Sequence, residues 1–292
     1  MQVTANGIEI EYETLGDPAV DPLLLIMGLG GQLTAWDDEL LRMLVDHGHF
    51  VIRFDNRDAG LSTKFDSAEV PNMTELMVAP PQGRTPDVPY LLDDMAEDAA
   101  GLLDALDIER THVLGVSMGG MIAQTLAIRH PTRVKSLVSV MSATGDPDQP
   151  RSDPEVLAKL MTPPPPDREA RIEQSVEIWR MLAGPGFPFD EDRARARSSR
   201  AYDRCFYPVG VGRQLAAIIA SGSRAEALGR LNIPALVIHG QDDPLVPVGC
   251  GRMTAEAIPG AELLLIEGMG HDIPPALFET FTDEIAARTV SG

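Results

Sequence analysis

One serine of the chain, Ser117, lies in a pattern that suits a nucleophile. It is the centre of GVSMG (115–119), which directly follows the apolar run HVLGV and precedes a helix-like segment. A serine held in a sharp strand-to-helix turn needs small neighbours two positions away, and Gly115 and Gly119 provide them. The N-terminus of the following helix would stabilise a developing oxyanion. The pattern predicts a nucleophile elbow; its alternative is a glycine-rich turn whose serine only caps the helix.

A serine hydroxyl needs a base and an orienting acid to react, and two later segments offer them. In sheets built around such an elbow, the acid follows a later strand and the histidine follows the last one. His271 stands in the loop after the last apolar run, AELLLI, and is the predicted base. Two carboxylates, Asp242 and Asp243, follow the run PALVIH. We predict Asp243 as the acid, because it directly precedes Pro244, and Asp242 as a turn residue or helix cap.

Two other histidines are predicted to be structural. His239 ends a buried strand only four residues before Asp243. It is too close in sequence to present its ring to both that acid and Ser117, so a buried, hydrogen-bonded imidazole is expected. His112 begins the strand that leads to the elbow, and therefore lies at the opposite end of the sheet from the serine.

An oxyanion hole needs two backbone N–H groups. One is expected from Met118, the residue after the nucleophile, and the other from a loop after an early strand. The segment LLLIMGLGGQ (23–32) carries glycines at positions 28, 30 and 31, which let the main chain run close to the site. It places Leu29 to donate the second N–H. The alternative is a glycine-rich turn that serves only flexibility.

A second loop, DNRDAGLS (55–62), follows the next predicted strand. It resembles a supporting loop for the first one. Its Asp55 and Arg57 are candidates for a charge pair that holds the two loops together, and neither is assigned a part in chemistry.

Short apolar runs that alternate with helix-like segments must position these residues. Runs that are apolar on both faces predict parallel strands covered on both sides, and apolar recurrence near 3.6 residues predicts helices between them. This alternation indicates an α/β fold with a mostly parallel, doubly wound sheet. The segment IEIEYET (8–14) alternates with period two and predicts an antiparallel edge hairpin. The predicted strands are 23–27, 50–54, 112–116, 134–140, 234–239 and 261–266, and the predicted helices are 36–48, 90–106, 118–130 and 274–289.

The alternation lapses between residues 144 and 230. A connection of this length between two strands is too long for an ordinary crossover, so we predict an inserted helical cap (144–230) on a core formed by 1–143 and 231–292. Helix-like stretches at 173–184 and 190–204 support this interpretation. Apolar side chains of the cap are candidates for the substrate pocket: Met161, Trp179, Met181, Leu182, Phe187, Phe189 and Phe206.

Composition narrows the possible partners. The 292 residues include 24 basic and 44 acidic side chains, a net charge of −20, which disfavours nucleic acid and anionic membrane surfaces. No apolar run approaches the roughly 18 residues of a membrane span, and the N-terminus lacks a signal-peptide pattern, so a cytoplasmic protein is expected. Cys205 and Cys250 lack C-x-x-C spacing and are predicted free thiols. No metal or cofactor is expected, and the expected partner is a small molecule. A homodimer is possible.

With these motifs in place, the sequence resembles the α/β-hydrolase fold superfamily across essentially its whole length. The resemblance rests on HVLGVSMGG, LLLIMGLGG, VIRFDNRDAGLS, LVIHGQDDPLVP and GMGH. Within the superfamily the chain is most similar to the aclacinomycin methylesterase group of actinobacterial esterases, through DPLLLIMG, VIRFDNRDAGLST and, in the cap, WRMLAGPGFPFDED. The oxyanion segment departs from the family pattern, because it reads MGLGG where His-Gly is common.

The resemblance implies a serine carboxylesterase that acts through an acyl-enzyme, with a small-molecule ester as its substrate. By carry-over, Ser117 is the nucleophile, Asp243 the acid, His271 the base, and Leu29 and Met118 the oxyanion donors. A methylesterase that acts on a small or polyketide-like ester fits the narrower group. Carbon–carbon bond hydrolases and cofactor-free perhydrolases share the triad, and fold analogy does not separate them. Dehalogenases and epoxide hydrolases use an aspartate nucleophile and are excluded. A non-catalytic small-molecule-binding homologue is the alternative of another class.

Overall fold

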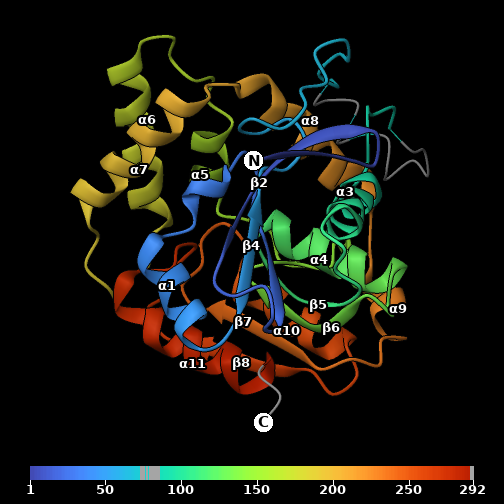
Figure 1. Cartoon of the computed structure of the whole chain (residues 1–292). Coiled ribbons are helices and arrows are strands. Elements are labelled where there is room, and N and C mark those ends of the chain that lie inside the picture. Colours follow the sequence, from blue (N-terminus) through green and yellow to red (C-terminus); the bar gives the residue numbers. More distant parts are fainter. Residues whose placement is uncertain (73–75, 77, 79–85, 290–292) are drawn as a thin grey trace.

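The strands form one mixed sheet in the computed structural model, which describes residues 1–72, 76, 78 and 86–289 (Figure 1). Within these residues the strand order is β1-β2-β4-β3-β5-β6-β7-β8. The pairs β1–β2 and β2–β4 are antiparallel, and the other neighbours are parallel. The mostly parallel sheet predicted from the apolar runs is therefore confirmed. The strands are β1 Gln2–Ala5, β2 Ile8–Leu15, β3 Pro22–Ile26, β4 Phe50–Phe54, β5 Thr111–Val116, β6 Val134–Val140, β7 Ala235–Gly240 and β8 Glu262–Ile266.

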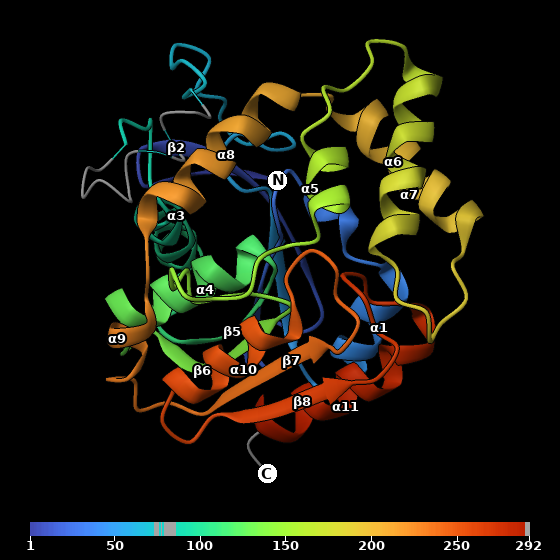
Figure 2. The ribbon, with the colours of Figure 1, turned by 180° about the vertical axis from the view of Figure 1, so that it is seen from behind.

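Helices cover both faces of this sheet, as expected for strands that are apolar on both sides (Figures 1 and 2). Side chains of β3 alternate between two cores: Leu24 and Ile26 join the core beneath α3, α4 and α10, while Leu23 and Leu25 join the core beneath α1 and α11. The helices are η1 Leu33–Ala35, α1 Asp38–Asp46, α3 Leu92–Ala105, α4 Met118–Arg129, α5 Pro154–Leu160, α6 Arg168–Leu182, α7 Glu191–Arg204, α8 Pro208–Ser221, α9 Ala225–Leu228, α10 Val248–Ala257, η3 Pro275–Leu277 and α11 Phe278–Thr289. Among the described residues, no helix combines the length and the apolar character that a membrane crossing requires.

The segment between β6 and β7 contains α5 to α9. Aspartates cap the N-termini of three of these helices. The side chains of Asp153, Asp167 and Asp190 accept backbone N–H groups from the first turns of α5, α6 and α7. Helices α6 and α7 pack on each other, and α8 lies against α3 (Figure 2). The short helix α9 contacts α4 and α10, so the last part of the inserted segment packs on the core.

Arg224, which directly precedes α9, connects the inserted segment to the chain that follows β6. Its backbone N–H donates to the carbonyl of Thr144 at 2.8 Å, and its Nη2 donates to the carbonyl of Ala143 at 2.9 Å. Burial lowers the pKa of Arg224 to about 10, which leaves the guanidinium charged at neutral pH. The start of the inserted segment and the chain before α9 therefore meet at one buried point after β6.

The two cysteines differ in their surroundings, and we expect them to differ in reactivity. Both are free; Cys205 is half-buried, and Cys250 is buried. Burial raises the pKa of the Cys250 thiol to about 11, and only the thiolate reacts with disulfide reagents. At pH about 8 we expect the native protein to consume one equivalent of an aromatic disulfide rapidly, and the unfolded protein two. Rapid reaction of a Cys205→Ser variant would contradict this expectation.

Candidate active site

The backbone at Ser117 has the sharp turn that its flanking glycines predict. Ser117 lies between β5 and α4 with φ 54° and ψ −122°, a conformation that L-residues rarely adopt. A Cβ atom on Gly115 would lie 2.1 Å from the carbonyl oxygen of Gly119, and one on Gly119 would lie 2.0 Å from that of Ile26. No side chain fits at either position, which explains why the pattern has glycine there.

The structure brings the serine, the histidine and Asp243 together. His271 Nε2 lies 3.1 Å from Ser117 Oγ, and His271 Nδ1 lies 2.7 Å from Asp243 Oδ2. The other carboxylate oxygen, Oδ1, accepts the N–H groups of Leu245 and Val246 at 2.9 and 2.8 Å. A carboxylate held in this way favours a proton on Nδ1, which leaves Nε2 free to accept the proton of the serine hydroxyl. The three side chains follow β5, β7 and β8, in the predicted order.

The neighbouring carboxylate, Asp242, contacts the backbone of the loop that carries His271 rather than the imidazole. It lies in a turn, the first of the two roles predicted for it, and caps no helix among the described residues. Its Oδ2 accepts the N–H of Gly268 at 2.9 Å, and its own N–H donates to the carbonyl of Met269 at 3.0 Å. Asp242 therefore ties the loop that carries the acid to the loop that carries His271.

The other two histidines have the structural surroundings that were predicted. His239 is buried, its Nε2 donates to the carbonyl of Val246 at 2.7 Å, and burial holds its pKa below the usual value. His112 is buried at the start of β5, with Nδ1 at 2.7 Å from Ser136 Oγ. Burial lowers the pKa of His112 to about 4. Both imidazoles are therefore neutral near pH 7.

The loop of the base also rests on the inserted segment. The N–H of His271 donates to the carbonyl of Leu182, the last residue of α6, at 2.7 Å. The N–H of Gly186 donates to the carbonyl of Gly268 at 2.9 Å. A Cβ atom on Gly184 would lie 2.2 Å from the same Gly268 oxygen, so the two chain segments are in backbone contact. The chain after α6 therefore supports the backbone that carries the imidazole.

The glycine-rich loop after β3 forms a tight turn against the nucleophile. The N–H of Gly31 donates to the carbonyl of Gly28 at 3.1 Å, and Gly30 has φ +66°, which together define a type II turn. A Cβ atom on Gly28 would lie 3.2 Å from Ser117 Cβ. Because the carbonyl of Gly28 faces into the turn, the Leu29 N–H of the same planar peptide group points the opposite way. We call residues 27–32 the oxyanion loop.

The predicted charge pair between Asp55 and Arg57 is wrong. Arg57 Nε lies 2.6 Å from Asp98 Oδ2 on α3, and Asp55 Oδ2 lies 2.7 Å from Arg204 Nη1 on α7. Both arginine–carboxylate pairs connect elements distant along the chain, which local spacing does not reveal. Asp55 does link the two loops by another route, since its Oδ1 accepts the N–H of Leu33 at 2.7 Å.

Two glutamines at the oxyanion loop were missed by sequence analysis. Gln32 belongs to the loop, and Gln214 contacts it. Gln32 Nε2 donates to the carbonyls of Ala201 and Cys205 at 2.7 and 2.9 Å. Gln214 Oε1, on α8, accepts the N–H of Gly30 at 2.8 Å. Their partners lie far along the chain, so no local pattern could identify them.

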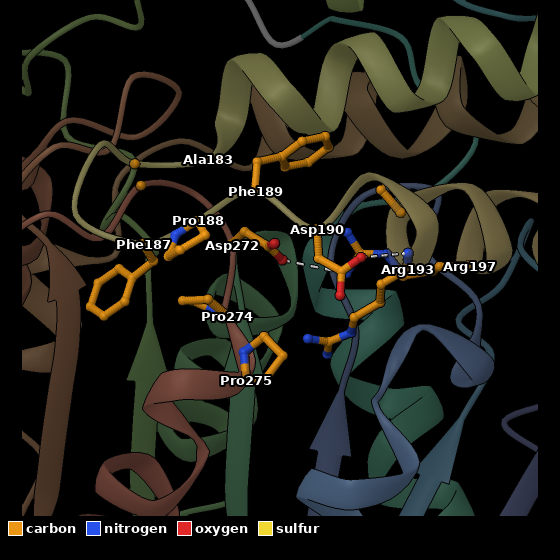
Figure 3. A pocket seen from close by; sticks show the side chains of 13 residues that line it. Ala183, Phe187, Pro188, Phe189, Asp190, Arg193, Arg197, Asp272, Pro274 and Pro275 are labelled. Atoms are coloured by element: carbon orange, nitrogen blue, oxygen red, sulfur yellow. Dashed lines mark hydrogen bonds and ion pairs between the residues drawn. The ribbon is translucent and has the colours of Figure 1, made fainter.

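A small cavity lies between the chain after α6, the start of α7 and the loop of the base (Figure 3). Its volume is about 30 Å³, room for a water molecule or two but not for an ester. Phe187 and Phe189, two of the predicted pocket residues, line it together with Gly270 and Asp272, which flank His271. Ser117 is not part of its lining, so the cavity adjoins the base rather than the nucleophile.

The remaining pocket candidates are dispersed over the inserted segment. Met161 and Phe206 are exposed, and Leu182 is buried. Met181 is half-buried, and Trp179 packs against the α6–α7 core with the Arg197 guanidinium 3.7 Å from its ring centre. Within the described residues, no three His, Cys, Asp or Glu side chains are grouped so that they could hold a metal ion.

Comparisons with known proteins agree with the fold. The chain matches the family model described as alpha/beta hydrolase fold over residues 21–274. It is 33% identical to rhodomycin D methylesterase DauP of Streptomyces sp. (strain C5), over 98% of this chain and 97% of that protein. A poly(3-hydroxyalkanoate) depolymerase of Ectopseudomonas oleovorans is 31% identical over 88% of this chain and 80% of that protein.

A solved structure shows the same fold at lower identity. The meta-cleavage product hydrolase CumD of Pseudomonas fluorescens IP01 has a TM-score of 0.77 at 21% identity, over 98% of this chain and 96% of that one. The two rhodomycin D methylesterases, DauP and DnrP, confirm the resemblance to a methylesterase group. On the family match and on these relatives, the chain belongs to the alpha/beta hydrolase fold family.

Proposed function

We propose that this protein is a carboxylic ester hydrolase that works through an acyl-enzyme on Ser117. The observation that carries the proposal is the unbroken hydrogen-bonded line from Ser117 Oγ through the His271 ring to Asp243. A serine hydroxyl, an imidazole and a carboxylate in this relation form the arrangement by which a weak nucleophile is activated.

The proposed reaction has two steps, acylation of Ser117 and hydrolysis of the acyl-enzyme. Ser117 Oγ attacks the ester carbonyl while His271 Nε2 takes its proton, and the N–H groups of Leu29 and Met118 hold the oxyanion. The carbon–oxygen bond to the alcohol then breaks, and the imidazolium returns the proton to the leaving alkoxide. Water repeats the sequence on the acyl-enzyme, which releases the acid and restores the serine. Asp243 keeps the imidazole in its working tautomer throughout.

A methyl ester of a small or polyketide-like acid is the substrate class we propose. Relatives named rhodomycin D methylesterase match the chain at 33% identity over nearly its full length. The match includes the inserted segment, whose WRMLAGPGFPFDED stretch also contacts the loop of the base. We assign the substrate preference to that segment, because it contacts the loop that carries His271.

A carbon–carbon bond hydrolase is the second candidate. A relative from Cupriavidus pinatubonensis named 2-hydroxy-6-oxononadienedioate/2-hydroxy-6-oxononatrienedioate hydrolase is 34% identical, but over only 59% of this chain. The ester hydrolase is favoured because the methylesterase relatives match across the whole chain. Turnover of a ring-cleavage diketone in preference to every ester tested would reverse this order.

Covalent labelling tests the proposal directly. A fluorophosphonate probe should add its mass to the peptide that contains Ser117, and the protein should release nitrophenol from a short-chain nitrophenyl ester. Heat-denatured protein is the control, because an unfolded serine has no base beside it. Native protein that shows neither labelling nor turnover would overturn the proposal and favour the non-catalytic binding alternative.

A further inference from the structure

A glutamine of the inserted segment, Gln214, bridges the oxyanion loop and the loop after β4. It lies on α8 and is fully buried. The N–H of Gly30 donates to its Oε1 at 2.8 Å, and its Nε2 donates to the carbonyl of Arg57 at 2.7 Å. Because an N–H can only donate and a carbonyl can only accept, the amide has one possible orientation. One buried side chain therefore holds backbone groups of two loops of the core.

These contacts restrain the peptide groups on both sides of Leu29. The carbonyl of Gly28, in the peptide before Leu29, accepts the N–H of Gly31, and the N–H of Gly30, in the peptide after it, donates to Gln214. Helix α8 also touches the turn from the side, since a Cβ atom on Gly30 would lie 2.9 Å from Val211 Cγ2. Glycine gives the turn wide conformational freedom, so its geometry depends on such external contacts.

We propose that Gln214 is a positioning residue that sets the direction of the Leu29 N–H, and that the inserted segment thereby controls the oxyanion hole. The inference rests on the ester hydrolase function proposed above. Gln214 acts through the backbone of the turn and contacts neither substrate nor Ser117. Without it, the N–H of Gly30 loses its side-chain acceptor, and the peptide groups beside Leu29 can rotate away from the oxyanion.

A Gln214→Met variant keeps the size of the side chain and removes both hydrogen bonds. Because a displaced oxyanion donor acts mainly in the transition state, kcat for nitrophenyl butyrate should fall about 10- to 100-fold, with KM changed by less than about 3-fold. The Ki of an alkyl trifluoromethyl ketone, whose hemiketal places an oxyanion in the hole, should rise by the same factor. The Ki of the matching secondary alcohol, which forms no oxyanion, should stay unchanged.

Gln124 provides the matched control. It is a fully buried glutamine on α4 whose side chain accepts from Arg224 Nε and donates to Ser139 Oγ, both at 3.2 Å. Gln124→Met should lower Tm as Gln214→Met does, but should leave kcat and the ketone Ki within about 3-fold of wild type. The inference is overturned if folded Gln214→Met keeps wild-type kcat, or if both variants lose kcat equally.

A second variant, Gln214→Glu, keeps the test decisive if the methionine variant does not fold. A protonated carboxyl accepts from Gly30 and donates to the Arg57 carbonyl as the amide does, whereas an ionised one cannot donate. Burial raises the pKa of such a group, so the kcat ratio of variant to wild type should increase as pH falls from about 8 to about 6. A ratio that stays flat contradicts the positioning role alone. Wild-type protein without turnover or Ser117 labelling contradicts the proposed function as well.

Discussion

Replacement of Ser117 by alanine is expected to lower kcat for ester hydrolysis about 10⁴-fold or more, while the protein stays folded. The Ser117 hydroxyl lies 3.1 Å from His271 Nε2 and is the group proposed to form the acyl-enzyme. Alanine meets the same backbone strain at φ 54° as serine does, and it loses a single hydrogen bond, so Tm should change little. Steady-state turnover of a nitrophenyl ester and thermal unfolding measure the two effects.

Ser136→Ala provides a matched control for this experiment. Ser136 also hydrogen-bonds a histidine, His112, but at the opposite end of the sheet. We expect this variant to retain wild-type turnover. Substantial hydrolysis by purified Ser117→Ala protein, with the mass confirmed, would show that another group carries the reaction.

Replacement of Asp243 by asparagine is expected to lower kcat by about 10⁴-fold with the local geometry intact. The N–H groups of Leu245 and Val246 both donate to Oδ1 and require an acceptor there. The amide oxygen of asparagine must therefore take that position, which turns its NH₂ group toward His271 Nδ1. The imidazole then accepts at Nδ1 and carries its proton on Nε2, so it cannot receive the proton of Ser117.

A variant of the neighbouring aspartate, Asp242, tests whether the effect is specific to Asp243. Asp242→Asn keeps an oxygen for the N–H of Gly268, so its loss of kcat should be at least about 100-fold smaller than that of Asp243→Asn. Parallel kinetics of the two variants, with circular dichroism to show that both fold, measure the difference. The reverse order would move the acid to Asp242 and contradict the structure of the site.

Patterns within short stretches of sequence were enough to predict the elements that carry the site. The runs 50–54 and 134–140 coincide with β4 and β6, because strands buried on both faces carry apolar side chains at most positions. The glycines two residues before and after Ser117 also predicted the nucleophile turn, because that turn leaves no room for a side chain at either position. Helix α6 begins at Arg168, earlier than its apolar pattern suggested, because the Asp167 cap extends a polar first turn.

Contacts between distant segments could not be predicted in this way. Asp55 and Arg57 are two residues apart and of opposite charge, yet Asp55 pairs with Arg204 on α7 and Arg57 pairs with Asp98 on α3. In a buried setting each charge takes the partner that the packing of helices presents, and sequence proximity has no part in that choice. The same holds for Gln214, whose partners Gly30 and Arg57 belong to loops joined only in the folded molecule.

The backbone contact between the chain after α6 and the loop of His271 limits how the substrate range can be redesigned. An exchange of the whole insertion for that of a relative would replace Leu182, whose carbonyl receives the His271 N–H, together with Gly184 and Gly186. A chimera can retain residues 182–187 from this chain and take only the flanking helices from the relative. Such a chimera is expected to keep the backbone contacts that position the His271 imidazole. Specificity and turnover can then be varied separately in this scaffold, with the graft junctions placed on either side of that hexapeptide.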